Sequence, residues 1–287
     1  MTGRVCVITG ATRGIGRATA EGLARLGATL VLVVRRREDG AAVARELRHA
    51  HAAPPAEVVP ADLASQHSIR EAAETIRAHH PALHVLINNA GTIPKERETT
   101  VDGLEMQLAV NHLAYFLLTN LLLDRLIAGA PARIVNVSSG AHQGGTIDFA
   151  DLQSERRYDP VRVYGRTKLA NVLFTYELAR RLEGTGVTAN CLHPGVIATR
   201  LLAEYMNLPL VGGAVARTFG SSPEAGAATS LHLAASPAVE GVTGKYFVES
   251  RATRSSRESY DEELQRRLWD RSAELTALEG ASAPGVE

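Results

Sequence analysis

The stretch VCVITGATRGIGRATA, residues 5–20, constrains the fold of this chain more than any other segment. It joins a short apolar strand to a helix through a turn that contains Gly10, Gly14 and Gly16. Gly10 permits a sharp turn, and the two later glycines let a phosphate approach the backbone N–H groups at the helix N-terminus. Because the glycines lie between a strand and a helix, as such a site requires, the stretch predicts dinucleotide binding.

Short β-branched runs alternate with segments of helical period along the rest of the chain. The predicted strands cover 5–9, 29–34, 57–60, 84–88, 133–138, 187–193 and 245–248. The predicted helices cover 15–26, 37–51, 66–80, 102–128, 163–183 and 223–235. Most strands are apolar throughout, as expected when helices cover both faces of a parallel sheet. The alternation predicts an α/β fold with a doubly wound, Rossmann-like parallel sheet of about seven strands.

The same pattern sets the expected organisation of the chain. We expect one domain over residues 1–270, followed by a loose tail at 271–287. Residues 200–222 interrupt the alternation and are rich in apolar side chains and glycine, so we expect them to form a substrate lid. Ser222 followed by Pro223 predicts the start of the last helix in this pattern, because serine caps helices and proline suits the first helical position.

Composition excludes several classes of partner. Lys plus Arg and Asp plus Glu number 31 each, so net charge gives no reason to expect nucleic acid or an anionic membrane as partner. No apolar run reaches the ~18 residues of a membrane span, and the first strand begins too early to leave room for a signal peptide. Cys6 and Cys191 lie in apolar runs and predict buried thiols in a cytoplasmic protein. His79 and His80 lack a third ligand, so we expect no metal site.

The end of the second predicted strand indicates which dinucleotide fits. Folds that bind NAD place Asp or Glu there to hold the ribose hydroxyls, but here Val34 occupies that position and Arg35 follows. Arg13, in the glycine turn, adds a second guanidinium. Guanidinium groups bind phosphate in a bidentate manner, which favours NADP(H) over NAD(H). The alternative is a solvated cluster at a helix start, which we prefer for Arg36 and Arg37.

The segment YGRTK places a phenol and an ammonium four residues apart, at Tyr164 and Lys168. Residues with this spacing share one face of a helix. Free tyrosine has a pKa of about 10, and a nearby cation lowers it. A Tyr–Lys pair in a cleft is therefore suited to general acid/base catalysis, whereas the same pair facing water has no function.

Together these motifs resemble the short-chain dehydrogenase/reductase family over about residues 3–250. The matching motifs are TGATRGIG (9–16), ADL (61–63), NNAG (88–91), Asn111, VSS (137–139), YGRTK (164–168) and HPG (193–195). The stretches VNHLAYFLLTNLLLDRL and TKLANVLFTYELARRLEGTGVTANCLHPGV are similar to the retinol-dehydrogenase branch in particular. Two features depart from that branch. We expect no N-terminal membrane-anchoring helix, which weakens the case for retinoids in membranes, and Thr167 replaces the usual serine before the lysine.

The resemblance implies a catalytic tetrad of Asn111, Ser139, Tyr164 and Lys168. Lys168 would lower the pKa of Tyr164, Ser139 would bind the substrate oxygen, and Asn111 would hold a water. Ser138 adjoins Ser139, and spacing alone does not distinguish them; the family pattern favours Ser139. The sequence and the resemblance together give these cofactor contacts: Gly10, Thr12, Arg13, Gly14, Ile15, Gly16, Arg35, Asp62, Leu63, Asn89, Ala90, Gly91, Tyr164, Lys168, Pro194, Gly195, Ile197 and Thr199.

The function implied is an NADP(H)-dependent oxidoreductase that acts on a small alcohol, aldehyde or ketone. The apolar lid favours a lipophilic or ring-containing substrate. By analogy with the family, the leucine-rich segment 102–128 suggests a homodimer or homotetramer. Three alternatives stay open: a non-catalytic NADP(H)-binding regulator, an epimerase or dehydratase, and a serine hydrolase built on Ser139. The spacing of the turn glycines disfavours the second, and the absence of a G-x-S-x-G motif disfavours the third.

Overall fold

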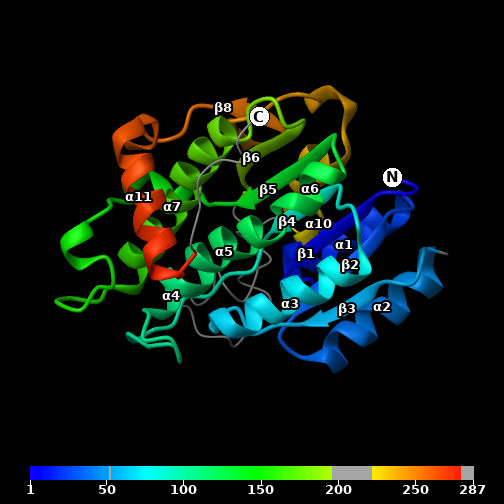
Figure 1. The fold of residues 1–287 in the computed structure, drawn as a ribbon, viewed down its shortest axis with the longest axis horizontal. Helices are drawn as coiled ribbons and strands as arrows, with labels where there is room; N and C mark the ends of the chain where they lie inside the picture. The colour runs from blue at the N-terminus through cyan, green and yellow to red at the C-terminus, as the bar shows by residue number, and fades with distance from the viewer. Residues whose placement is uncertain (52, 196–221, 279–287) are drawn as a thin grey trace.

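The computed structural model describes residues 1–51, 53–195 and 222–278 (Figure 1). The predicted lid lies outside these residues except for Ser222. Ile197 and Thr199, two of the predicted cofactor contacts, also lie outside them.

An eight-stranded sheet forms the centre of the described structure, in the order β3-β2-β1-β4-β5-β6-β7-β8. The strands are β1 (Val5–Thr9), β2 (Thr29–Val34), β3 (Glu57–Pro60), β4 (Val85–Asn88), β5 (Ala132–Val137), β6 (Val187–His193), β7 (Tyr246–Val248) and β8 (Arg251–Thr253). The first seven pair in parallel and confirm the predicted doubly wound sheet. The sequence analysis did not predict β8, which pairs antiparallel with β7 and exposes all three of its residues.

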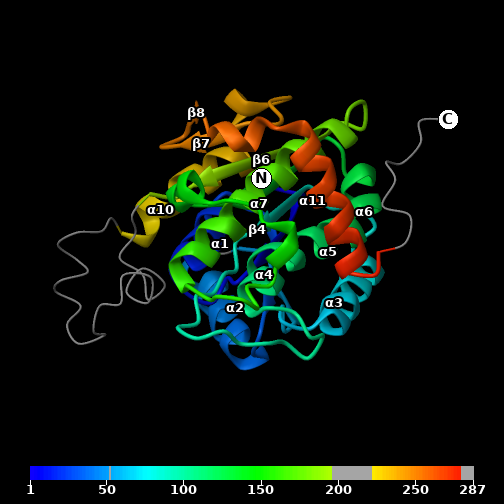
Figure 2. The same cartoon turned by 90° about the vertical axis from the view of Figure 1, so that its left-hand side faces the viewer.

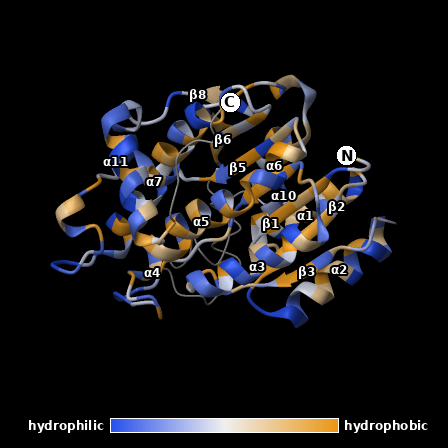
Figure 3. Ribbon diagram, viewed as in Figure 1, coloured by the Kyte–Doolittle hydropathy of each residue, from blue (hydrophilic) through white to orange (hydrophobic). Residues whose placement is uncertain are grey.

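Helices cover both faces of the sheet, as the continuously apolar strands predicted. They are α1 (Gly14–Arg25), α2 (Arg37–His51), α3 (Gln66–His79), α4 (Met106–Leu108), α5 (Ala114–Leu121), α6 (Leu123–Ala128), α7 (Pro160–Arg181), α10 (Pro223–Ala235) and α11 (Glu262–Leu275). Cys6 and Ile8 pack in the layer of α1, α2 and α10, whereas Val7 packs in the layer of α3, α5, α7 and α11. Figure 2 shows α1 and α10 on one side and α3, α5 and α11 on the other. The apolar strands run between helices of mixed hydropathy (Figure 3).

Several predicted details are present in the structure. Ser222 caps α10 by accepting a hydrogen bond from the Ala225 N–H, and Pro223 occupies the first turn. Cys6 and Cys191 are buried free thiols. Among the described residues, no helix has the length and apolar character that crossing a membrane requires.

The predicted helix 102–128 is not continuous. Residues 106–108 form α4, Ala109–Leu113 form a π-helix (η1), and α5 and α6 follow. In η1 the Ala114 N–H bonds Ala109 O, which is the five-residue spacing of a π-turn. Such turns are frequent at functional sites, and this one contains Asn111.

Helix α11 was also missing from the sequence prediction. It packs on α7, and its residues 271–275 belong to the segment that we expected to be a loose tail. The Trp269 ring lies 4.9 Å from that of Phe116 in α5 and 5.7 Å from that of Phe174 in α7, measured between centroids. The α5 side chains Leu117 and Leu118 are buried within the chain itself. The leucine-rich pattern therefore needs no second subunit to explain it.

Candidate active site

The motif residues gather at the carboxyl edge of the sheet. The glycine turn follows β1, Asn89–Gly91 follow β4, Ser138 and Ser139 follow β5, and Pro194–Gly195 follow β6. The strand order reverses between β1 and β4, and ligands of open α/β sheets bind outside the carboxyl ends of the strands at such a switch point.

Close packing explains the glycines of the turn. Gly10 and Gly14 have φ angles of 70° and 55°, which other residues rarely adopt. A Cβ at Gly16 would lie 2.4 Å from both Asn89 Nδ2 and Gly10 O. Asn89, expected near the cofactor ribose, uses its side chain to hold this turn: Nδ2 donates to Thr9 O at 2.9 Å.

The start of α1 suits a phosphate group. Helix α3 is capped by the side chain of Ser65, and α7 by that of Asp159. At α1 the N-cap residue is Arg13, whose side chain makes no capping hydrogen bond, and no acidic residue lies in the first turn. The first N–H groups of an α-helix have no partner within the helix, so an uncapped start can bind a phosphate. The residues present therefore fit a dinucleotide.

The other predicted contacts to the adenosine half lie beside this turn. Thr12 and Arg13 are in the turn, Ile15 is in the first turn of α1, Arg35 follows β2, and Asp62 and Leu63 follow β3. Arg13 and Arg35 are exposed, and neither forms an ion pair within the described part of the chain. Arg36 instead pairs with Asp39 at 2.7 Å, in agreement with its interpretation as a surface residue.

Tyr164 and Lys168 both face the interior, on one side of α7. Their exposed fractions are 8% and 2%. Lys168 Nζ lies 5.5 Å from the centroid of the Tyr164 ring and donates to Val137 O at 3.0 Å. The Tyr115 ring lies 5.6 Å from the same nitrogen, and its hydroxyl donates to Ala90 O. The ammonium is thus held close to two phenol rings at the end of β5.

Burial sets the protonation of Lys168. Loss of hydration lowers its pKa from 10.5 to about 7. A cation in so dry a place is costly, and a negative charge beside it reduces that cost. The geometry thus offers a cation to a negative charge formed at Tyr164, whereas burial raises the pKa of the other neighbouring phenol, Tyr115, and keeps it protonated.

The structure distinguishes the two serines after β5. Ser138 is 1% exposed, and its hydroxyl donates to Lys168 O at 2.8 Å. Ser139 is half-buried, and its Oγ accepts from the Ala141 N–H at 3.2 Å. The hydroxyl hydrogen of Ser139 therefore stays available for a substrate oxygen, whereas that of Ser138 is used within the fold.

Asn111 is buried and fully engaged. Its Nδ2 donates to Thr92 O at 3.0 Å and to Thr167 Oγ1 at 3.2 Å, and its Oδ1 accepts from the Thr92 N–H at 2.8 Å. Thr167 in turn donates to Tyr164 O at 2.9 Å. The structure thus gives Asn111 a bridging role between the segment after β4 and α7.

The sequence analysis missed Tyr115 and underestimated Thr167. Tyr115 lies four residues after Asn111, and that spacing places two residues on one helix face, so it was a usable signal. Thr167 was noted only as a replacement for serine. Its hydroxyl links Asn111 to the tyrosine backbone.

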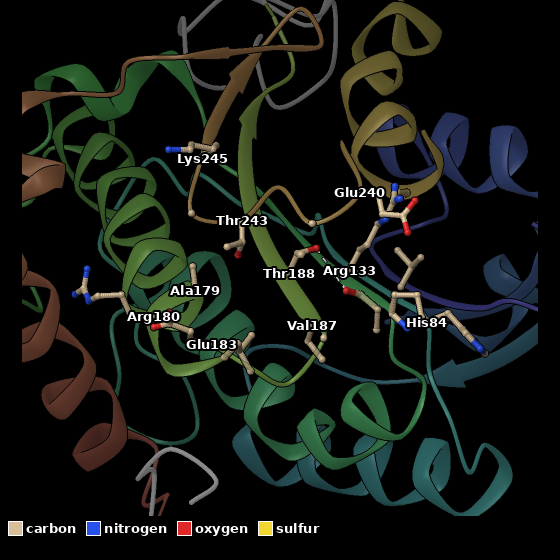
Figure 4. A pocket seen from close by; sticks show the side chains of 18 of the residues that line it. His84, Arg133, Ala179, Arg180, Glu183, Val187, Thr188, Glu240, Thr243 and Lys245 are labelled. Carbon is tan, nitrogen blue, oxygen red and sulfur yellow. Dashed lines mark hydrogen bonds between the residues drawn. The ribbon is translucent and has the colours of Figure 1, made fainter. Parts of the chain in front are cut away.

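A cavity of about 950 Å³ opens at the opposite edge of the sheet. Figure 4 shows Arg133 and Glu240 on one side of it and, on the other, Arg180 from the end of α7 and Glu183, which follows that helix. None of the four predicted tetrad residues lines it. The tetrad residues and this cavity thus lie at opposite edges of the sheet.

Comparison with known proteins identifies the family of this chain. The family model described as short chain dehydrogenase matches residues 4–207. Retinol dehydrogenase 14 from Homo sapiens is 45% identical, over 97% of this chain and 88% of its own length. A solved structure from Mycobacterium paratuberculosis is 35% identical with a TM-score of 0.80, covering 99% of this chain and 96% of its own. The RhlG/NADP active-site complex from Pseudomonas aeruginosa is 28% identical with a TM-score of 0.69, covering 86% and 94%.

Proposed function

This chain belongs to the short-chain dehydrogenase family of oxidoreductases, and we propose that it transfers a hydride between NADP(H) and a carbonyl or alcohol carbon of a lipophilic small molecule. The observation that carries the proposal is the Tyr164–Lys168 pair, with Lys168 Nζ buried 5.5 Å from the tyrosine ring centroid. The names of the retinol dehydrogenase relatives support an apolar substrate for this chain as well.

The proposed chemistry assigns one task to each side chain. Tyr164 donates a proton from its hydroxyl to the substrate oxygen in reduction and removes it in oxidation. The Lys168 ammonium stabilises the phenolate that forms, since a nearby cation favours that charge. The Ser139 hydroxyl donates to the same substrate oxygen and stabilises its developing charge. Bound NADP(H) supplies the hydride for reduction and accepts it in oxidation.

The remaining residues would bind and orient the cofactor. The uncapped start of α1 would hold its diphosphate, and Arg13 and Arg35 would bind the 2′-phosphate, because both guanidiniums are exposed beside the turn. Lys168 would also contact the nicotinamide ribose, as the family resemblance implies.

Turnover assays test the proposal. We would follow NADPH oxidation, with NADH in parallel, against a panel of hydrophobic aldehydes and ketones. Wild type is expected to prefer NADPH, and Tyr164→Phe to lose about 10²–10⁴-fold in kcat, the range for general acid/base catalysis. NADPH affinity should stay within about twofold, which separates lost chemistry from lost binding.

Tight NADPH binding without turnover of any carbonyl or alcohol would contradict the proposal and favour the regulatory alternative. Equal rates with NADH would contradict the roles given to Arg13 and Arg35.

A further inference from the structure

Helix α11 contacts the catalytic corner through a row of buried polar side chains. His112 follows Asn111 in the π-helix, and its Nε2 lies 2.9 Å from Ser272 Oγ in α11. The other ring nitrogen, Nδ1, lies 3.3 Å from Asn171 Oδ1 in α7. His112 and Ser272 are each 1% exposed, and Asn171 is fully buried. Polar groups this deep persist when they are hydrogen-bonded to one another.

Asn171 completes the connection to the site. Its Nδ2 donates to the backbone carbonyl of Asn111 at 2.8 Å. A π-turn shifts the backbone hydrogen-bond pattern by one residue, and here a side-chain amide from α7 binds a carbonyl within the turn. The peptide that carries the Asn111 side chain is thereby held by α7, one turn after Thr167.

The direction of these bonds follows from the amide. Because Asn171 Nδ2 donates to a carbonyl, Asn171 Oδ1 must face the histidine, so Nδ1 of His112 carries the hydrogen. In the neutral ring Nε2 is then the acceptor for the Ser272 hydroxyl. The single hydrogen of that hydroxyl is also donated to Leu268 O at 2.7 Å, one turn earlier in α11, so the two acceptors share it. Burial lowers the pKa of His112 to about 4, which keeps the ring neutral near pH 7.

We propose that His112 and Asn171, supported by Ser272 of α11, are positioning residues that hold the π-turn so that Asn111 and, through Thr167, Tyr164 keep their catalytic placement. The inference rests on the proposed function of the same site. It makes α11, which lies far from the site in the sequence, part of the support of the active site. It also explains the presence of the π-turn, which directs the Asn111 side chain to the site and the His112 side chain to α11.

Removal of one hydroxyl tests this inference. Ser272→Ala should lower kcat by about two- to tenfold, the range that one hydrogen bond's net contribution implies. The affinity for NADPH should be unchanged, because in the part of the chain that the structure describes the Ser272 side chain is bonded to His112 and Leu268, away from the glycine turn. Ser259→Ala is the matched control: Ser259 is also fully buried and its Oγ donates to Ser256 O at 2.6 Å, but it does not contact the π-helix. The control should keep the wild-type kcat.

A double variant and amide hydrogen exchange give two further tests of the inference. If both residues act through the same contact, Ser272→Ala added to His112→Ala should cause no further loss of kcat. Amide hydrogen exchange in residues 109–116 should be faster in Ser272→Ala than in wild type and unchanged in α1. Equal effects of Ser272→Ala and Ser259→Ala, or no effect of the former on either kcat or exchange, would overturn the inference. If wild type turns over no substrate, the proposed function has failed, and hydrogen exchange alone decides whether α11 holds the π-turn.

Discussion

The catalytic corner and the adenosine corner of this site are built in opposite ways. At the catalytic corner Asn111, Thr167 and Lys168 are each at most 2% exposed and are joined by hydrogen bonds from three elements. At the adenosine corner Arg13 and Arg35 extend from a turn and a strand end and are exposed.

The difference indicates how each corner works. Proton transfer needs fixed geometry, so its residues are arranged before any ligand arrives. Recognition of a phosphate needs charge, which a flexible side chain can deliver upon binding. We therefore expect a change at the catalytic corner to lower kcat strongly. A change at the adenosine corner should affect cofactor binding only modestly.

The largest effect is expected for Lys168→Met. It should lower kcat by about 10³-fold, within the range for acid/base catalysis. It should also raise the melting temperature by a few degrees: the folded pKa of about 7 lies below the ordinary 10.5, so the folded state binds the proton more weakly. At neutral pH the buried cation costs about 4 kcal/mol. Calorimetry and steady-state kinetics on one preparation check both parts, and a lower melting temperature would contradict the second.

Acid should weaken the catalytic corner through His112. Its pKa is lowered from 6.5 to about 4 by burial, so between these values the unfolded chain binds the proton more strongly than the folded one. The free energy of unfolding should therefore fall as pH decreases from 6.5 to 4, by up to about 3 kcal/mol from this group. Urea denaturation at several pH values measures the slope. His112→Gln should show a smaller slope, and an unchanged slope would assign the effect to other groups.

A smaller change is expected at the adenosine corner. Arg35→Asp should weaken NADPH binding by about tenfold, as loss of one charge-assisted hydrogen bond implies, and leave NADH binding nearly unchanged. Arg36→Asp is the matched control, since Arg36 already pairs with Asp39. Fluorescence titration with NADPH and NADH distinguishes the two variants. If both variants weaken NADPH binding equally, the effect comes from the overall charge of this surface and not from a specific contact of Arg35.

The smallest effect is expected at the amino edge of the sheet. Lys245 lines the large cavity there and is exposed. Lys245→Ala should change kcat and KM by less than about twofold, because surface substitutions away from special features have small effects. A larger loss would mean that this cavity participates in turnover.

The sequence predicted the parts of this molecule that depend on local pattern. The apolar runs of β1, β2, β5 and β6 and the glycine turn follow directly from periodicity and conformational preference. Strand β8 was missed because its three residues are all exposed and carry no apolar period. The π-turn was missed because its hydrogen bonds shift by one residue within an otherwise helical, apolar segment.

The sequence motifs predicted the four tetrad residues, but they did not predict the residues that hold the tetrad in place. Asn171 and Ser272 are small polar residues on helices, and such residues have no distinguishing pattern in a sequence. Their role depends on α11 returning to α7 and the π-helix, and this is a long-range contact that periodicity does not encode. The separation of Ser138 from Ser139 likewise required knowing which hydroxyl bonds Lys168 O.

Trp269 is the only tryptophan of the chain, and it lies at the centre of the contact between α11 and the rest of the protein. Its ring is 4% exposed, and the Arg181 guanidinium lies 4.2 Å from its centroid. The tryptophan emission of the native protein thus comes from a single buried indole. Detachment of α11 would hydrate that indole and shift its emission to longer wavelength. The wavelength of this intrinsic fluorescence would therefore report, without any label, whether α11 is in place.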